Sequence, residues 1–408
     1  MIIQRKEAEQ LKERKTWLFV FGRRKTGKSF LVKNFIKWDD FFFVKRDKTI
    51  LSESGESISY ETFINILRRE LNNNKTIVVD EFHRLGADFL DVIHALNKKG
   101  RLIVISSTLY LSKNLLGSKS PILGLFSEFP VRIIGLDDVL KALKNTNLKF
   151  TKKELLENAI ILKEPIAISY LNESKTARKI LAEIFLGTIK TVPALVGEIF
   201  LEEEKTLSSI YEGILRAVAQ GKIVSTEIAS YLFSKQLISN NDASMVQQYL
   251  KNLMDFGIIK KIEVYNKNKF IYKIGSPLIN LFYYADEKYN ISEREITAKE
   301  AENIIDNILP KIVEDVIREF AAKKTGLTES VIEEKDYDID ACLLKFKKPE
   351  IVIEVKWKSK IEKEEILKAE ANLGKINAKK KILFVQDKKG INSSLEVMDV
   401  EDLLKNGF

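Results

Sequence analysis

One eight-residue segment near the N-terminus restricts the possible folds of this chain more than any other feature. Residues 22–29 read Gly-Arg-Arg-Lys-Thr-Gly-Lys-Ser and match the pattern G-x-x-x-x-G-K-[ST]. The apolar run Trp17–Phe21 precedes them, and a helical pattern starts at Gly27. A loop between a strand and a helix can curl so that successive N–H groups point at phosphate oxygens. The segment therefore predicts a phosphate-binding loop in an α/β domain with a mostly parallel sheet.

The side chains of this loop indicate the ligand. Lys28 is expected to reach the β and γ phosphates of a nucleotide, and Ser29 to bind Mg²⁺. The predicted cofactors are therefore ATP and Mg²⁺. The loop residues predicted to bind them are Gly22, Arg23, Arg24, Lys25, Thr26, Gly27, Lys28 and Ser29.

Two further apolar runs end in polar residues that suit the same site. The run 76–79 ends in Asp80, a predicted Mg²⁺ ligand, and in Glu81, a predicted catalytic carboxylate that polarises the attacking water. The run 101–105 ends in hydroxyl side chains, of which Ser107 is predicted to sense the γ phosphate. A serine-rich strand end that only turns the chain is the alternative for Ser107. Arg84, Arg101 and Arg132 are positional candidates for an arginine finger, and the sequence singles out none of them.

Composition limits the class of protein. The 408 residues are 45% hydrophobic and 31% charged, which is typical of a folded globular chain. The apolar runs are shorter than the roughly 18 residues that a membrane helix needs, the N-terminus resembles no export signal, and a single cysteine excludes an intrachain disulfide framework. We expect a cytoplasmic protein with no membrane partner. The net charge of +9 makes a polyanionic partner plausible.

The pattern of elements predicts four segments. Strands and helices alternate through 1–140, the expected P-loop core, and helical periodicity dominates 141–205, an expected lid or connector. Segment 206–290 shows three helices followed by a hairpin, which describes a winged helix-turn-helix. Segment 291–408 begins with a long helical stretch, in which Pro310 is expected to start or kink a helix. Strands and a further helix follow it.

The expected winged helix has one polar helix face and a basic hairpin. In 242–256 the apolar residues recur at helical spacing, which leaves polar side chains on the opposite face. These side chains and the hairpin lysines are suited to contact DNA bases and phosphates. A solvated face or a protein-contact surface is the alternative. The predicted DNA-binding residues are Gln247, Gln248, Lys251, Lys260 and Lys261.

The C-terminal segment places three ionisable residues on two neighbouring strands. Asp340 lies in one strand, and Glu354 and Lys356 lie on one face of the next. A hairpin that turns at 347–349 would set Asp340 opposite 354–356. Carboxylates that bind Mg²⁺ and a lysine that holds a water are the catalytic groups of a metal-dependent phosphodiesterase. A ladder of salt bridges on an exposed sheet is the alternative.

The motifs of the first two hundred residues resemble those of one family. The sequences GRRKTGKS, VVDEFHRL and VISS, followed by a winged helix, are similar to the archaeal ATPase family of the AAA+ superfamily, which is related to STAND-type signalling ATPases. The resemblance implies that 5–11 packs near the adenine. It also implies a lid motif Gly-Gly-x-Pro, of which this chain keeps only Pro165, a predicted nucleotide-binding residue.

The C-terminal pattern resembles that of a second family. A helix that bears Glu314, a strand with Asp340 and a strand with Glu-x-Lys are similar to the PD-(D/E)xK nuclease superfamily, with its α/β restriction-endonuclease-like fold. The resemblance implies a metal site made of Glu314, Asp340 and Glu354. It leaves open whether the fold has kept the ability to cleave.

Together these observations predict an ATP-hydrolysing AAA+ type protein that acts on or with DNA. The alternative is a signalling switch, in which slow ATP turnover regulates assembly as a homo-oligomer or with a protein partner, and the C-terminal fold only binds. DNA-stimulated ATPase activity would distinguish the first from the second.

Overall fold

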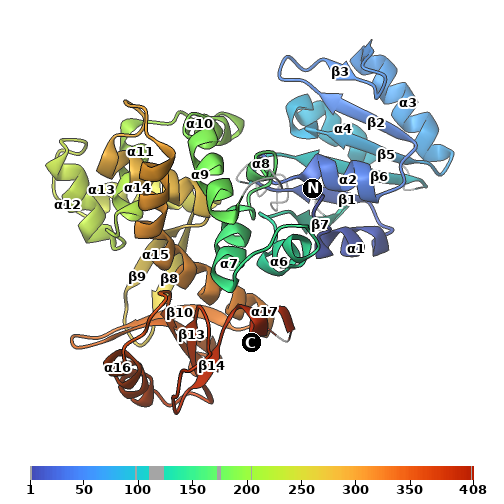
Figure 1. Cartoon of the computed structure of the whole chain (residues 1–408). Helices are drawn as coiled ribbons and strands as arrows, with labels where there is room; N and C mark the ends of the chain where they lie inside the picture. The colour runs from blue at the N-terminus through green and yellow to red at the C-terminus, as the bar shows by residue number, and fades with distance from the viewer. Residues whose placement is uncertain (1, 97–98, 110–123, 172–175, 204, 406) are drawn as a thin grey trace.

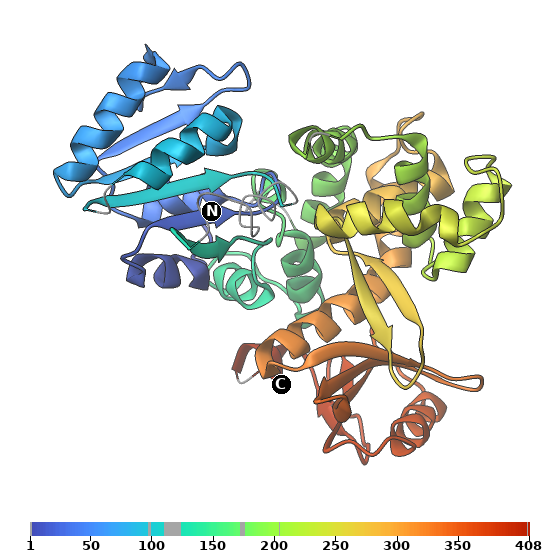
Figure 2. The ribbon, with the colours of Figure 1, turned by 180° about the vertical axis from the view of Figure 1, so that it is seen from behind.

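The structure of the chain, a computed structural model, describes residues 2–96, 99–109, 124–171, 176–203, 205–405 and 407–408. It contains two seven-stranded sheets at opposite ends of the molecule, with helices between and around them (Figure 1). The view from behind shows the same separation of the two sheets (Figure 2).

The N-terminal sheet has the order β4-β3-β2-β5-β6-β1-β7. Five neighbouring strands are parallel, because helical crossovers connect them. All of them except the edge strand β7 are buried along most of their length, which explains their continuous apolar runs. The parallel strands are β2 (Asp40–Val44), β5 (Thr76–Asp80), β6 (Arg101–Ser106), β1 (Leu18–Phe21) and β7 (Ser127–Pro130), and a short antiparallel edge adds β3 (Ile50–Leu51) and β4 (Ser57–Ile58).

The predicted parallel α/β core is therefore confirmed, with one strand displaced. The apolar run 131–136 in the sequence predicts a further strand, but β7 ends at Pro130. The apolar residues that follow it are buried in other ways: Val131 packs with the core beneath α2, and Ile134 and Leu136 pack with the helices of the next segment. Burial, not strand formation, accounts for this apolar pattern.

Helices cover this sheet and lead away from it. The helices of the first 140 residues are α1 (Lys6–Glu13), α2 (Lys28–Phe35), α3 (Tyr60–Asn72), the 3₁₀ turn η1 (Phe82–Leu85), α4 (Ala87–Ala95) and, at the end, α6 (Leu136–Lys144). The helices that follow are α7 (Lys152–Ile161), α8 (Pro165–Ile168), α9 (Ala177–Thr188) and α10 (Thr191–Glu202).

No single helix within the described ranges is long and apolar enough to cross a membrane. The pair α9 and α10 passes that test together by length and composition, with a bend of 53° between them. Both helices bury many apolar side chains in the largest core of the protein.

The next helices form one packed group. Helices α11 (Ser209–Ala219), α12 (Ser225–Ser234) and α13 (Ser244–Asp255) precede a hairpin of β8 (Ile259–Val264) and β9 (Phe270–Ile274). The apolar residues predicted for α13 face the core, with Val246, Leu250 and Leu253 fully buried. Helix α14 (Pro277–Tyr289) then packs against α11.

A second sheet contains this hairpin and the C-terminal strands. Its order is β14-β13-β12-β11-β10-β8-β9, so β8 pairs with β10 in parallel register. The C-terminal elements are α15 (Ala298–Thr325), β10 (Thr328–Glu333), β11 (Asp338–Lys345), β12 (Lys348–Lys356), α16 (Lys363–Gly374), β13 (Lys380–Val385), β14 (Glu396–Met398) and α17 (Val400–Lys405).

Helix α15 starts earlier than predicted. Thr297 and Glu300 form a capping box at its N-terminus, and Pro310 lies inside its 28 residues. Pro310 therefore does not start this helix. The capping box supplies the hydrogen bonds that the first helical N–H groups need.

Candidate functional site

The loop 22–29 runs from the end of β1 into α2, and two of its glycines are required by the geometry. A Cβ at Gly22 would lie 2.1 Å from the carbonyl oxygen of Val131, so no larger residue fits there without a shift of the backbone. Gly27 adopts the left-handed conformation, with φ of +88°, at the N-cap of α2. The loop therefore brings its backbone to the N-terminus of a helix, where anions bind.

Lys28, the first residue of α2, is buried beneath this loop. Its Nζ donates a hydrogen bond to the carbonyl oxygen of Arg23 at 2.9 Å. Burial lowers the pKa of Lys28 to about 8, and the nearby carboxylates of Glu81 and Asp80 oppose this shift. An anion next to Lys28 would stabilise its charged form.

Asp80 ends β5 and has an unused ligand atom. Its Oδ1 is buried and has no hydrogen-bond partner among the described residues. Burial, and then the charge of Glu81, raise the pKa of Asp80 to about 6, while a hydrogen bond from Ser29 acts in the opposite direction. An orphaned carboxylate oxygen beside a serine hydroxyl has the donor chemistry that Mg²⁺ prefers, so these two residues fit the expected ion.

Glu81 is held in place by the neighbouring strand. It adopts the left-handed conformation, with φ of +58°, which is uncommon for a residue other than glycine. Its Oε2 accepts hydrogen bonds from the Ser107 hydroxyl at 2.7 Å and from the Ser107 N–H at 3.2 Å. Ser107 therefore positions the predicted catalytic carboxylate.

A pocket of about 500 Å³ opens at this edge of the sheet. Seven of the residues predicted to bind the nucleotide or to catalyse line it, and they are Arg24, Lys25, Gly27, Lys28, Ser29, Glu81 and Ser107. The other lining residues are Arg84, one of the three candidates for an arginine finger, and four residues that were not predicted to bind the nucleotide: Phe30, Phe43, Lys45 and Arg46.

The remaining predicted nucleotide-binding residues lie behind the pocket. Arg23 is buried and pairs with Glu164, and the Thr26 hydroxyl donates to the Arg23 carbonyl at 2.9 Å. Pro165 Cγ lies 4.0 Å from the position that a Cβ on Gly27 would take. The structure thus places Gly22, Arg23, Thr26 and Pro165 where they shape the loop rather than line the cavity. Asp80, at the end of β5 beside Ser29, is also not among the lining residues.

Residues 14–122 match a protein family that is described as an AAA domain. This segment is similar to that family, and we refer to it below as the AAA domain. The match supports the AAA+ type of core that the loop motifs predicted. None of the curated proteins matches the chain by sequence.

Several solved structures are similar to the chain at low identity. The Aeropyrum pernix ORC2 protein in ADPNP–ADP complexes is 12% identical, with a TM-score of 0.42, over 77% of this chain and 95% of that one. The Aeropyrum pernix ORC1 protein in complex with DNA is 14% identical, with a TM-score of 0.33, over 70% and 93%. A STAND protein with a tetratricopeptide repeat sensor from Pyrococcus horikoshii is 12% identical, with a TM-score of 0.31, over 78% of this chain and 47% of that one. At these scores the likeness carries no conclusion about the function of this chain.

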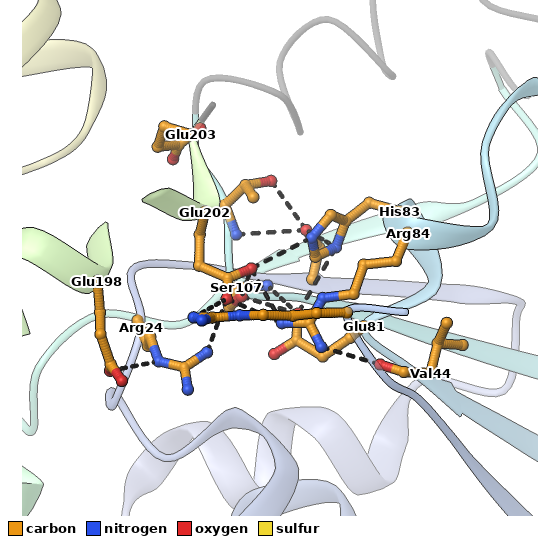
Figure 3. Close-up of polar contacts among 12 residues, drawn as sticks. Arg24, Val44, Glu81, His83, Arg84, Ser107, Glu198, Glu202 and Glu203 are labelled. Atoms are coloured by element: carbon orange, nitrogen blue, oxygen red, sulfur yellow. Dashed lines mark hydrogen bonds and ion pairs between the residues drawn. The ribbon is translucent and has the colours of Figure 1, made fainter. Parts of the chain in front are cut away.

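A carboxylate from outside the matched segment reaches the surroundings of Glu81. Glu202, at the end of α10, reaches the side chains around Glu81 and is only 4% exposed (Figure 3). Its Oε1 lies 2.8 Å from Arg84 Nη2 and 2.9 Å from Arg24 Nη1, and its Oε2 lies 3.2 Å from the Ser107 hydroxyl. Sequence reasoning missed Glu202, because no motif marks it and more than ninety residues separate it from Ser107.

A histidine lies between the two glutamates of this cluster. His83 Nδ1 is 3.6 Å from Glu81, and its Nε2 is 3.5 Å from Glu202. Across the described residues, these three side chains form the one group of at least three His, Cys, Asp or Glu residues whose ligand atoms lie within 4.8 Å of one another. Arg84 is ion-paired with Glu202 in the same place, so a positive charge already occupies this position.

The C-terminal hairpin has the predicted register. Ala341 pairs with Ile353 and Cys342 with Val352, which sets Asp340 opposite Glu354. The Val355 N–H donates to Asp340 Oδ2 at 2.8 Å. Lys356 Nζ lies 2.6 Å from Glu354 Oε1, whereas Glu354 Oε2 is buried without a partner in the described chain.

The hairpin carboxylate Asp340 lies close enough to Glu314 of α15 for their charges to interact. Burial and the charges of Glu314 and Glu354 raise the pKa of Asp340 well above its ordinary value. Burial and the charge of Asp315 raise the pKa of Glu314 to about 7. Mutual repulsion of buried carboxylates is relieved by a proton or a cation, so the donor set and the orphaned oxygen fit a divalent ion. The described part of the chain does not, however, bring the ligand atoms of Glu314, Asp340 and Glu354 within 4.8 Å of one another as one group.

The residues predicted to bind DNA lie in two different environments. Gln247, Gln248 and Lys251 are exposed on α13. Lys260, by contrast, forms ion pairs with Glu319 at 3.0 Å and Glu329 at 3.2 Å. Lys261 lies over the ring of Phe270, with Nζ 3.6 Å from the centroid. The α13 face is therefore freer to meet a polyanion than Lys260 is.

Proposed function

We propose that this chain binds ATP in the pocket of its AAA domain and hydrolyses it. The observation that carries the proposal is the convergence of Lys28, at the start of α2, with Asp80 and Glu81, at the carboxyl end of β5, beside a phosphate-binding loop. Ser29 and Asp80 would hold Mg²⁺, which neutralises phosphate charge when bound.

The residues have separate roles in this reaction. Lys28 and the N–H groups of the loop bind the β and γ phosphates. Glu81 orients a water and accepts its proton as the water oxygen bonds to the γ phosphorus and the bond to the bridging oxygen breaks. Ser107 holds the Glu81 carboxylate in position for that transfer.

Two variants test the nucleotide site. Lys28→Ala should lose tight MgATP binding, because the charge on the phosphates is removed. Glu81→Gln should keep binding and lose turnover by about 10²–10⁴-fold, since an amide oxygen can still accept from Ser107 but takes up no proton. Unchanged ATP affinity in the Lys28 variant would reject this assignment of the loop.

We further propose that the protein acts with DNA through the winged helix formed by α11–α13 and the β8–β9 hairpin. The exposed polar face of α13 and the chain's net charge of +9 support this part. The acidic cluster of Asp340 and Glu354 with Lys356 is the proposed nuclease-like site. ATP turnover with and without single-stranded, duplex and branched DNA is the experiment: stimulation by DNA supports the proposal.

The second candidate is a nucleotide-regulated switch. The contacts of Glu202 favour it, because they connect α10 directly to Ser107 and Arg84 in the AAA domain. A switch of this kind requires nucleotide-dependent oligomerisation or partner binding, with little response of turnover to DNA.

A further inference from the structure

Three guanidinium groups from separate parts of the AAA domain converge on a single carboxylate oxygen. Glu202 Oε1 lies 2.8 Å from Arg84, 2.9 Å from Arg24 and 3.2 Å from Arg46. Arg24 belongs to the phosphate-binding loop, Arg46 follows β2, and Arg84 lies in η1 just after Glu81. The contacts with Arg84 and Arg24 are visible in Figure 3.

These arginines also face the pocket. Six of its twelve lining residues are Arg or Lys, and Glu81 is the one acidic residue among the twelve. Three of the six are Arg24, Arg46 and Arg84, and arginine keeps its charge at all relevant pH values, so this part of the excess cannot be relieved by loss of a proton. The site therefore needs an anion, and here the Glu202 carboxylate supplies one.

The geometry points to an anion site, made by Arg24, Arg46 and Arg84, that takes the terminal phosphate of a nucleoside triphosphate and that Glu202 fills until the nucleotide arrives. The inference rests on the proposed ATP function. A terminal phosphate carries more charge than a carboxylate and offers three acceptor oxygens, so it is the better partner for three guanidinium groups.

Glu202 also competes with Glu81 for a hydrogen bond from the Ser107 hydroxyl. The one proton of this hydroxyl faces both Glu81 Oε2, at 2.7 Å, and Glu202 Oε2, at 3.2 Å. Withdrawal of Glu202 would leave the hydroxyl to Glu81 alone. Arrival of the terminal phosphate would thus free the end of α10 and complete the positioning of the catalytic carboxylate in one step.

Glu202 should affect the binding of a nucleoside triphosphate but not that of a diphosphate. A diphosphate has no terminal phosphate to offer, so it leaves Glu202 in place. Removing the charge of Glu202 should therefore raise the affinity of the chain for the triphosphate and leave its affinity for the diphosphate nearly unchanged.

The test measures the affinities of the full chain for MgADP and for the magnesium complex of a non-hydrolysable ATP analogue. Glu202→Gln should tighten the analogue by about tenfold or more while MgADP stays within about twofold. Glu198→Gln is the matched control, because Glu198 lies on the same helix and, among the residues that the structure describes, pairs with Arg24 alone, at 2.6 Å. This control should change neither affinity by more than about twofold.

A second variant removes an arginine that the fold does not need. The Arg46 side chain is 58% exposed, so Arg46→Ala should fold normally. We expect it to weaken the ATP analogue and to spare MgADP. Equal ratios of the two affinities in the parent, Glu202→Gln and Arg46→Ala proteins would overturn the inference while leaving ATP binding intact. The proposed ATP function would be contradicted by a different result: a Lys28→Ala protein that binds both nucleotides with the affinities of the parent.

Discussion

Arg23 Nη2 donates hydrogen bonds to both carboxylate oxygens of Glu164 at 2.8 Å, which joins the phosphate-binding loop to the residue that precedes Pro165. The side chains are only 6% and 1% exposed. Lys163 precedes Glu164, and its Nζ lies 3.5 Å from Oε1 of Glu319 in α15. Two consecutive residues therefore connect the nucleotide loop with the C-terminal half of the molecule.

We expect Glu164→Ala to destabilise the protein by about 3–5 kcal/mol, because it leaves the buried Arg23 charge without a partner. Unfolding by denaturant measures the loss. Glu198→Ala removes a much more exposed partner of Arg24 and should cost less than about 1 kcal/mol. If both variants lose the same free energy of unfolding, burial of the Arg23–Glu164 pair does not add to its contribution to stability.

The affinity for MgATP should depend on pH on both sides of neutrality. Lys28, with its pKa at about 8, loses its charge as the pH rises, and Asp80, with its pKa at about 6, is protonated as the pH falls. Affinity should therefore be greatest between these values and decline by up to about tenfold per pH unit outside them. Calorimetric titration over this range tests the profile.

Metal-free ADP provides the control for the acidic limb of this profile. Its binding does not use Asp80 as a metal ligand, so it should keep its affinity below about pH 6. A decline as steep as that of MgATP would assign the acidic limb to another group.

The acidic cluster of the C-terminal hairpin should respond to divalent ions. Mg²⁺ or Mn²⁺ titrated into the full chain should raise its melting temperature by mass action. Asp340→Asn should abolish the part of this shift that depends on the hairpin. In chelator the same variant should melt higher than the parent, because one of the mutually repelling carboxylates is gone while the Val355 N–H keeps an acceptor.

The same cluster predicts a direction for stability against pH in chelator. Raised carboxyl pKa values, such as that of Glu314 at about 7, mean that the folded state holds protons that the unfolded state has released. Stability should therefore fall as the pH rises from about 4.5 to 7. Asp340→Asn should flatten this slope, and an unchanged slope would assign it to other groups.

Substitutions of Lys251 and Lys260 should have different effects, because we propose that Lys251 contacts DNA whereas Lys260 forms ion pairs within the fold. Lys251→Glu should weaken duplex binding by similar factors for unrelated sequences and reduce its salt dependence, as expected for a phosphate contact. Lys260→Glu should mainly lower the melting temperature, because it places a third carboxylate beside Glu319 and Glu329. Binding by the Lys251 variant that matches the parent would leave α13 as a protein-contact surface.

Local patterns predicted much of the AAA domain and the hairpin register. The loop residues 22–29 and the strand ending in Asp80 follow from glycine conformation and apolar runs, which act over a few residues. The contact of Asp340 with the Val355 N–H follows from strand alternation and a short turn. These features depend on neighbours in the sequence.

The residues that sequence reasoning missed depend on distant parts of the chain. Glu202 meets Arg84 because the fold brings the end of α10 to η1, and Lys260 meets Glu319 because the fold brings α15 beside β8. Charge alone marks Glu202 no more than any other glutamate in the sequence. The hairpin lysines likewise have the composition of a DNA-binding wing, while the fold gives Lys260 internal partners.

The pairing of β8 with β10 determines how this protein can be dissected. Ser330 and Val331 of β10 run in register with Glu263 and Val264 of β8, so one sheet spans the predicted boundary at residue 290. A fragment that begins after this boundary would present the backbone of β10 as a bare edge, and the fragment before it would present β8. Exposed edges of this kind pair with one another and aggregate. A fragment meant to isolate the nuclease-like segment should therefore begin upstream of α11, so that it keeps the hairpin that completes its sheet.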